Sequence, residues 1–164
     1  MDYKARILPT RETLSRVKNL ENNTLISDVD LLLNLIATAD IIRDNIYSRL
    51  SQNYDISEGK FILLMALYSE GEVAVSELAL RIGVAPATVS IMVKRMLNDS
   101  NPLISINPSE MDKRSRVISL TQNGIKLIQT VLPNHLKAVR SFADVLNDDE
   151  RELMISMLKK LQRM

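Results

Sequence analysis

The chain of 164 residues contains no cysteine, a single histidine, four glycines and five prolines. Without cysteine there can be no disulfide, no thiolate metal site and no cysteine nucleophile. A zinc site needs three or four ligands, commonly His or Cys, so the lone His135 argues against a metal centre. Because few glycines and prolines interrupt it and no repeats occur, the chain is expected to be mainly helical.

Signals for membranes and for catalysis are also missing. No stretch is long and apolar enough to cross a bilayer, and the first twenty residues lack the apolar core of a secretory signal. We therefore expect a cytoplasmic protein with no membrane partner. The sequence has no Gly-rich phosphate loop, nucleophile elbow or histidine constellation, which predicts a protein that is not an enzyme and needs no cofactor.

Positive charge is concentrated in the middle of the chain. The net charge is only +1. The composition, with 46% hydrophobic and 25% charged residues, is ordinary for a folded protein. Between Arg81 and Arg116, however, six Lys and Arg residues face three Asp and Glu residues, whereas residues 57–80 hold one cation and four anions. Contacts with phosphate groups are therefore expected in the basic segment.

Long amphipathic helices are predicted on both sides of this segment. Apolar residues recur every three or four positions from Asp30 to Leu50, and again from Ile125 to Leu161, with a bend expected at Pro133. Thr121 and Asn147 are suited to cap the later helices. These apolar stripes exceed what one small module could cover, so we expect a homodimer that forms without DNA.

The basic segment itself has the pattern of a helix-turn-helix. A helix after Ser57 ends at Gly71, a short helix over 77–82 stops at Gly83, and a longer helix runs from about Pro86 to Asn98. In a helix-turn-helix the second helix enters the major groove of DNA. Its expected DNA contacts are Thr88, Ser90, Ile91, Lys94 and Arg95, for which a merely solvated helix surface is the alternative.

A basic hairpin follows. Two short strands joined by a loop over 108–116 are predicted from two apolar groups: Leu103, Ile104 and Ile106, and then Val117, Ile118 and Leu120. We expect this wing to contact DNA through Asp112, Lys113, Arg114 and Arg116. An ordinary turn residue beside a surface cation is the alternative for Asp112.

Several residue strings, in this order and spacing, resemble the MarR family of transcriptional regulators. They are Ser76-Glu77-Leu78-Ala79, Ile82-Gly83-Val84, Ala87-Thr88-Val89-Ser90, and Asp112-Lys113-Arg114 leading to Leu120-Thr121 with Gly124. The resemblance extends from about Asp30 to the end of the chain. It implies a dimer with interlocking first and last helices, two winged modules on a palindromic operator, and an Asp112 that holds Arg114 toward the minor groove. It also implies that a small anionic or phenolic ligand releases the DNA.

The predicted fold is mainly α (α+β), a winged helix-turn-helix with long N- and C-terminal dimerisation helices. It divides into a polar N-terminal extension (1–29), an N-terminal dimerisation helix (30–56), the winged module (57–121) and the C-terminal dimerisation helices (122–164). For an acidic aromatic ligand we expect Arg43 to pair with the anion and Tyr47 and Met65 to form apolar walls. A surface salt bridge and plain core packing are the alternatives for these three residues.

The chain also departs from the family pattern. Ala85 replaces the usual hydroxyl cap of the second helix, Ile91 stands where a polar or basic reader is more common, Ile106 replaces an arginine, and the link over 98–102 is longer. Two functions therefore compete. The first is a ligand-responsive repressor that binds double-stranded DNA, and the second is a winged-helix module that acts mainly through protein–protein interaction.

Overall fold

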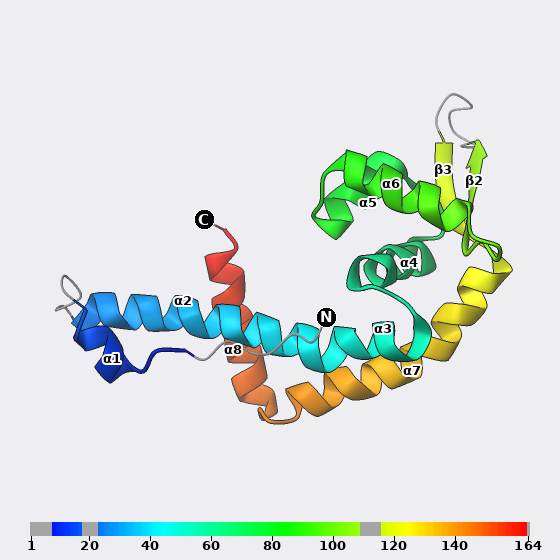
Figure 1. Cartoon of the computed structure of the whole chain (residues 1–164). Helices are drawn as coiled ribbons and strands as arrows, with labels where there is room; N and C mark the ends of the chain where they lie inside the picture. The colour runs from blue at the N-terminus through cyan, green and yellow to red at the C-terminus, as the bar shows by residue number, and fades with distance from the viewer. Residues whose placement is uncertain (1–7, 18–22, 109–115, 164) are drawn as a thin grey trace. The chain divides into compact units, whose positions relative to one another are not determined.

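The computed structural model describes residues 8–17, 23–108 and 116–163. Two compact units emerge, one from residues 1–49 with 141–164 and the other from residues 50–140. Figure 1 labels their α-helices and the strands β2 and β3. The winged module predicted for 57–121 falls within the second unit, while the exact boundaries of the four predicted parts stay a prediction.

The first unit contains more helix near the N-terminus than the sequence pattern predicted. Helix α1 (Arg11–Ser15) is capped by the Thr10 side chain, and helix α2 (Asn23–Ile42) begins at Asn23 instead of the expected Asp30. The Arg11 guanidinium donates to the Asp30 carboxylate at 2.5 Å, and Leu14 and Ile26 are buried. Arg11 and Asp30 are 19 residues apart in the chain, and Leu14 and Ile26 are isolated apolar residues. Helical periodicity therefore could not reveal these contacts.

The single long helix expected over Asp30 to Leu50 is interrupted. Helix α2 continues into a π-helical turn, η1 (Arg43–Tyr47), followed by helix α3 (Ser48–Tyr54). The Ser48 hydroxyl bonds the backbone carbonyl of Asp44 inside this turn. A π-helical turn adds a residue to the helical repeat, so the apolar pattern shifts without ending the helix.

The last helix, α8 (Asp148–Leu161), is capped as predicted but buries nothing in the single chain. The Asn147 side chain accepts from the Glu150 backbone N–H at 3.0 Å, and the Glu150 carboxylate accepts from the Asn147 N–H at 2.9 Å. No residue of α8 is buried, and Leu153 and Met157 are 61% and 48% exposed. Its apolar face is therefore open to solvent in one copy of the chain.

The second unit forms a winged helix-turn-helix. Its elements are α4 (Glu58–Glu70), β1 (Val73–Ala74), α5 (Val75–Ile82), α6 (Pro86–Leu97), β2 (Ile104–Pro108) and β3 (Arg116–Leu120). Ser57 caps α4 as expected, and Gly71 and Gly83 end α4 and α5 with φ values of 82° and 72°. Glycine adopts such positive φ values without steric cost, which explains the predicted breaks.

The wing strands form an antiparallel hairpin, as predicted, in a sheet of order β1-β3-β2. Ile104 pairs with Leu120 at one end and Pro108 with Arg116 at the other, and β1 joins through the pair Val73 and Ile118. Strand β1 has only two residues, so its alternation was too short to predict a strand. Residues 109–115, which include most of the predicted wing loop, lie outside the described residues.

Helices α4, α5 and α6 pack with the sheet around one core. Residues from every one of these elements are less than 2% exposed: Leu63, Leu64, Leu78, Val89, Ile104 and Ile118. Ile106, noted as a departure from the family pattern, lies opposite Ile118 in the hairpin and is half-buried. Its apolar side chain thus belongs to the packing of the wing.

Helix α7 (Gln122–Ala143) runs on through Pro133, where a bend had been expected. Its packing against α4 includes the His135 ring, whose centroid lies 4.4 Å from that of Phe61. Burial against this neighbour lowers the pKa of His135, so the neutral imidazole is favoured. The histidine that argued against a metal site therefore has a packing role.

The first turn of α7 is clamped to the chain that leaves α6. The Thr121 hydroxyl donates to the Pro102 carbonyl at 2.8 Å and accepts from the Gly124 N–H at 3.1 Å, while the Thr121 N–H donates to the Leu103 carbonyl at 3.0 Å. This confirms Thr121 as a cap. A Cβ atom on Gly124 would lie 2.1 Å from the Leu103 carbonyl oxygen, so only glycine fits here.

Replacing Gly124 by alanine should therefore destabilise the module. The new methyl group meets backbone that cannot move aside, and overpacking of this kind costs about 1–3 kcal/mol in the free energy of unfolding. Gly59→Ala is the matched control, because its Cβ would approach only the flexible Met92 Cε, at 3.3 Å. Thermal unfolding should show a clear loss for Gly124→Ala and little change for Gly59→Ala. Equal melting temperatures for the two variants would contradict the clamp.

Candidate nucleic-acid interface

Helix α6 has one buried face and one exposed face. Val89, Val93 and Met96 are buried in the core of the module. Successive residues turn by about 100° around a helix axis, which places Ile91 opposite both valines. All five α6 residues predicted to contact DNA are exposed: Thr88, Ser90, Ile91, Lys94 and Arg95. The face opposite the core is thus free to contact a ligand.

The first turn of α6 is uncharged and uses an unusual cap. Pro86 occupies the first helical position as predicted, and Ala85 at the N-cap makes no side-chain hydrogen bond. The Ser90 hydroxyl donates to the Pro86 carbonyl at 2.9 Å. The proton of this hydroxyl is therefore already used within the helix, although its oxygen can still accept a hydrogen bond.

Arg81 contributes less to the positive surface than the sequence count suggested. Its guanidinium donates to the Glu70 carboxylate at 2.5 Å and lies 3.5 Å from that of Glu77. These carboxylates, Glu70 above all, raise the pKa of Arg81. One of the six cations is thus paired with Glu70 across the connection between α4 and α5 and with Glu77 on its own helix.

Lys94 and Arg95 are the cations that α6 offers to solvent. Both lie in its last turn, both are exposed, and neither has an ion-pair partner within the described ranges. Cations on the exposed face of such a helix can contact phosphate oxygens on either side of a groove. Lys94 and Arg95 could therefore contact an anionic ligand from the exposed face of α6.

The base of the wing is well ordered by hydrogen bonds between its strands. The Ser105 and Ser119 hydroxyls lie 3.0 Å apart, and the Asn107 amide donates to the Ser119 hydroxyl at 3.1 Å. Arg116 is exposed at the start of β3. Asp112, Lys113 and Arg114 lie outside the described residues, so their DNA contacts stay a prediction.

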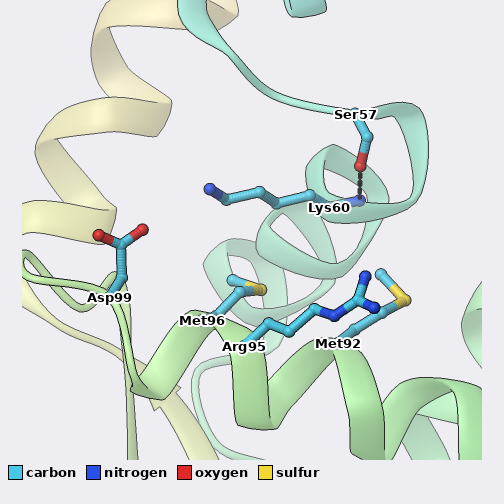
Figure 2. A pocket seen from close by; sticks show the side chains of 6 residues that line it. All are labelled: Ser57, Lys60, Met92, Arg95, Met96 and Asp99. Carbon is cyan, nitrogen blue, oxygen red and sulfur yellow. Dashed lines mark hydrogen bonds between the residues drawn. The ribbon is translucent and has the colours of Figure 1, made fainter.

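A cavity of about 210 Å³ lies between the start of α4 and the second half of α6. Its walls carry two cations, two methionines, a serine and an aspartate, as Figure 2 shows: Lys60, Arg95, Met92, Met96, Ser57 and Asp99. Sequence reasoning placed only Arg95 at a functional site. Lys60 and the methionines were missed because helical periodicity assigns them to one helix at a time and does not show which helices meet.

The residues predicted to hold an acidic ligand lie in different units. Arg43 and Tyr47 occupy the π-helical turn η1 in the first unit, and Met65 is half-buried on α4 in the second. The Arg43 guanidinium lies 3.6 Å from the carboxylate of Asp40, which is 4% exposed. The salt bridge considered as the alternative for Arg43 is thus present, and the three-residue ligand site stays a prediction.

No single helix in the described ranges is long and apolar enough to span a membrane. Helices α5 and α6 together have the length and composition, but they are bent by 110° relative to each other. That bend is the turn of the helix-turn-helix. Within the same ranges, no three His, Asp or Glu side chains are placed to share a metal ion.

The order of α4, β1, α5, α6, β2 and β3 defines a winged helix-turn-helix protein. Residues 56–115 match the model of the MarR family. The resemblance expected from the sequence strings is confirmed: the segment that holds the winged module matches the MarR family, and the relatives and solved structures it is similar to include transcriptional regulators of that family. The known relatives are regulators and not enzymes, in agreement with the expectation from the missing catalytic motifs.

The relatives and solved structures extend this similarity beyond the module. The transcriptional repressor YetL of Bacillus subtilis is 30% identical over 108 residues, which cover 65% of this chain and 64% of YetL. Sco3205 of Streptomyces coelicolor, solved in complex with DNA, has a TM-score of 0.75 at 19% identity, covering 83% of this chain and 86% of its own. BpsR of Bordetella bronchiseptica, whose DNA binding is regulated by 6-hydroxynicotinic acid, has a TM-score of 0.67 at 21% identity, with 80% and 92% covered.

Proposed function

We propose that this protein represses transcription by binding a palindromic operator in double-stranded DNA as a homodimer, and that a small aromatic or anionic ligand releases it. The observation that carries the proposal is the exposed face of α6, where Lys94 and Arg95 follow Thr88 on the side opposite the core. A recognition helix must present such a face to the major groove. YetL is named a repressor, which supports repression as the outcome. Because bacterial operators lie in the cytoplasm, the proposal also places the protein there.

Direct binding to DNA distinguishes this proposal from a module that acts mainly on other proteins. Specific binding should reach a dissociation constant of about 10⁻⁸–10⁻¹¹ M, whereas nonspecific binding is near 10⁻⁴–10⁻⁶ M at physiological salt. The exposed cations of α6 favour DNA. Enrichment of one duplex from a random pool by the full chain would identify the operator, and enrichment of none would favour the protein-interaction function.

We expect Arg114→Ala to weaken binding to this operator and to flatten its salt dependence. Each lost phosphate contact changes the slope of log affinity against log salt by about 0.9. In a narrow minor groove the arginine would favour A·T-rich flanks, and Asp112→Ala should act more mildly because the cation remains. Melting temperatures should barely change, since wing residues are expected on the surface.

Arg81→Ala is the matched control for Arg114→Ala. Arg81 belongs to the same basic segment, but its guanidinium is paired with Glu70 and Glu77. Its loss should leave the salt slope unchanged. If Arg114→Ala folds and binds with the wild-type affinity and slope, the wing does not touch DNA.

The open apolar face of α8 supports the homodimer. Leu153, Met154, Met157 and Leu161 are each more than 40% exposed in the single chain, and they share one side of the helix. A contiguous apolar surface of this kind marks an interaction site. A two-fold dimer would cover it with the same surface of a second copy and would place two α6 helices on inverted half-sites.

Leu153→Lys should convert the dimer into a folded monomer. The leucine is 61% exposed in one chain, so its replacement should cost the chain little but leave a charge buried in the dimer. Sedimentation equilibrium at micromolar concentration measures the change. Glu152→Lys, an exposed residue on the opposite side of α8, is the control and should stay dimeric. A wild-type protein that sediments as a monomer would contradict the homodimer.

Ligand release is supported by two groups of residues. Arg43 and Tyr47 lie one turn apart in η1, where irregular π-helical turns often accompany function. The cavity at Lys60 and Arg95 offers two cations beside two methionines, which suits an anion with an apolar body. A ligand there would engage Arg95, which the proposal assigns to DNA.

A panel of aromatic acids tested at millimolar concentration should contain one that raises the melting temperature and releases operator DNA, because a ligand that binds the folded state stabilises it. Lys60→Met removes the shift if the ligand occupies the cavity, and Arg43→Met removes it if the ligand binds at η1. No thermal shift and no release with any acid would contradict the ligand response.

A further inference from the structure

The part of α6 that would lie deepest in the major groove carries no charge. From Ile82 to Val93 the chain has no Asp, Glu, Lys or Arg residue, and no Asn or Gln. This stretch includes the turn of the helix-turn-helix and the first two turns of α6. Residues near the start of a recognition helix are the ones that contact base edges.

Ile91 lies at the centre of the exposed face of α6. It is 54% exposed, and the buried Val89 and Val93 are on the opposite side of the helix. One turn earlier on the same face are Ala87 and Thr88, and one turn later are Lys94 and Arg95. The exposed face is therefore apolar over Ala87, the Thr88 methyl group and Ile91, and the two cations lie at its C-terminal end.

The apolar part of this face has few groups that could read bases by hydrogen bonds. Guanine and adenine are usually recognised in the major groove by the paired donors of Arg and Lys or by the amides of Asn and Gln. Here the Ser90 hydroxyl proton is given to the Pro86 carbonyl, and the Ala85 side chain has no polar atom. Thr88 is left as the one hydroxyl of this face with no described partner.

We propose that α6 selects its operator mainly through the 5-methyl groups of thymine, with Ile91 as the contact that covers them. The inference rests on the proposed DNA-binding function and specifies what the recognition helix reads. Thymine is the base that presents an apolar group at the major-groove edge, and it is recognised by apolar side chains. Covering a methyl group removes its surface and that of Ile91 from water, which favours binding.

The same exposed isoleucine would also suit a protein partner. The cations next to it favour DNA. Phosphate groups line the edges of the major groove, and a helix whose apolar residues face the bases would bring Lys94 and Arg95 close to them. An apolar protein surface would leave these cations without partners. Protein docking at this face is therefore an outcome that the test must be able to reveal.

The test begins with the operator selected by the full wild-type chain from a random duplex pool. In this duplex each thymine is replaced in turn by deoxyuridine, which removes only the 5-methyl group and keeps every base pair. At one or two positions of each half-site the affinity should fall about fourfold, equivalent to about 0.8 kcal/mol for one covered methyl or methylene group. Exchanging a sensitive T·A pair for 5-methylcytosine·guanine should be tolerated better than exchange for cytosine·guanine, because only the former keeps the methyl group.

Protein variants connect the effect to Ile91. Ile91→Ala should bind the thymine operator more weakly and lose its sensitivity to deoxyuridine at the same positions. Leu80→Ala is the matched control: Leu80 is 83% exposed, but on α5, and its loss should leave the sensitivity intact. Both leucine and isoleucine are on the surface, so both variants should fold.

The outcomes separate this inference from the function it rests on. The thymine inference is supported if the operator affinity of the wild-type chain falls when particular thymine methyl groups are removed, and that of the Ile91→Ala variant does not. Specific binding that is indifferent to deoxyuridine overturns it and leaves the DNA-binding function standing. If no duplex is selected, both the thymine inference and the DNA-binding function fail. A protein partner that binds the wild-type chain but not the Ile91→Ala variant would assign this face to protein docking.

Discussion

One small set of contacts around Thr121 and Gly124 fixes the start of α7 against the segment that joins α6 to the wing. The first turn of α7 closes on the segment that leaves α6, through the Thr121 bonds to Pro102 and Leu103 and the absence of a side chain at Gly124. The Leu103 carbonyl sits where any Cβ atom on Gly124 would collide. Since β2 starts at the next residue, Ile104, this clamp also sets where the hairpin begins. Leu120, Thr121 and Gly124 thus keep their spacing in the sequence because all three take part in this contact.

The core of the module decides which side of α6 can meet a ligand. Val89 and Val93 are buried in the core of the module, whereas Ser90 and Ile91, which lie between them in the chain, are exposed. Pairing of Arg81 with Glu70 and Glu77 offsets the charge of one exposed cation, so the positive charge without an acidic partner on α5 and α6 comes from Lys94 and Arg95. The exposed face of α6 is thus apolar with cations at its C-terminal end, and it is the basis for both the proposed operator binding and its dependence on thymine.

Sequence reasoning located most of the module because its signals are local. The residues that cap or end helices act within one helical turn, and each marks a boundary that the structure shows: Ser57, Gly71, Gly83, Pro86, Thr121 and Asn147. It missed what depends on distant contacts. Examples are β1, which is a strand only because β3 lies beside it, the early start of α2, where Arg11 meets Asp30, and the ion pair of Arg81 with Glu70. The cavity at Lys60 and Arg95 was missed for the same reason, since its walls come from two helices.

The central claim is that α6 lies in the major groove of an operator. Since the chain has no cysteine, Ala87→Cys creates a unique thiol on the exposed first turn of α6, to which an iron chelate that cleaves nearby DNA can be attached. The account predicts two cleavage centres, one in each half-site, about one helical turn apart, on the strand edges that border the major groove. A conjugate that binds the operator with unchanged affinity but cleaves neither half-site, or cleaves only across the minor groove, would contradict it.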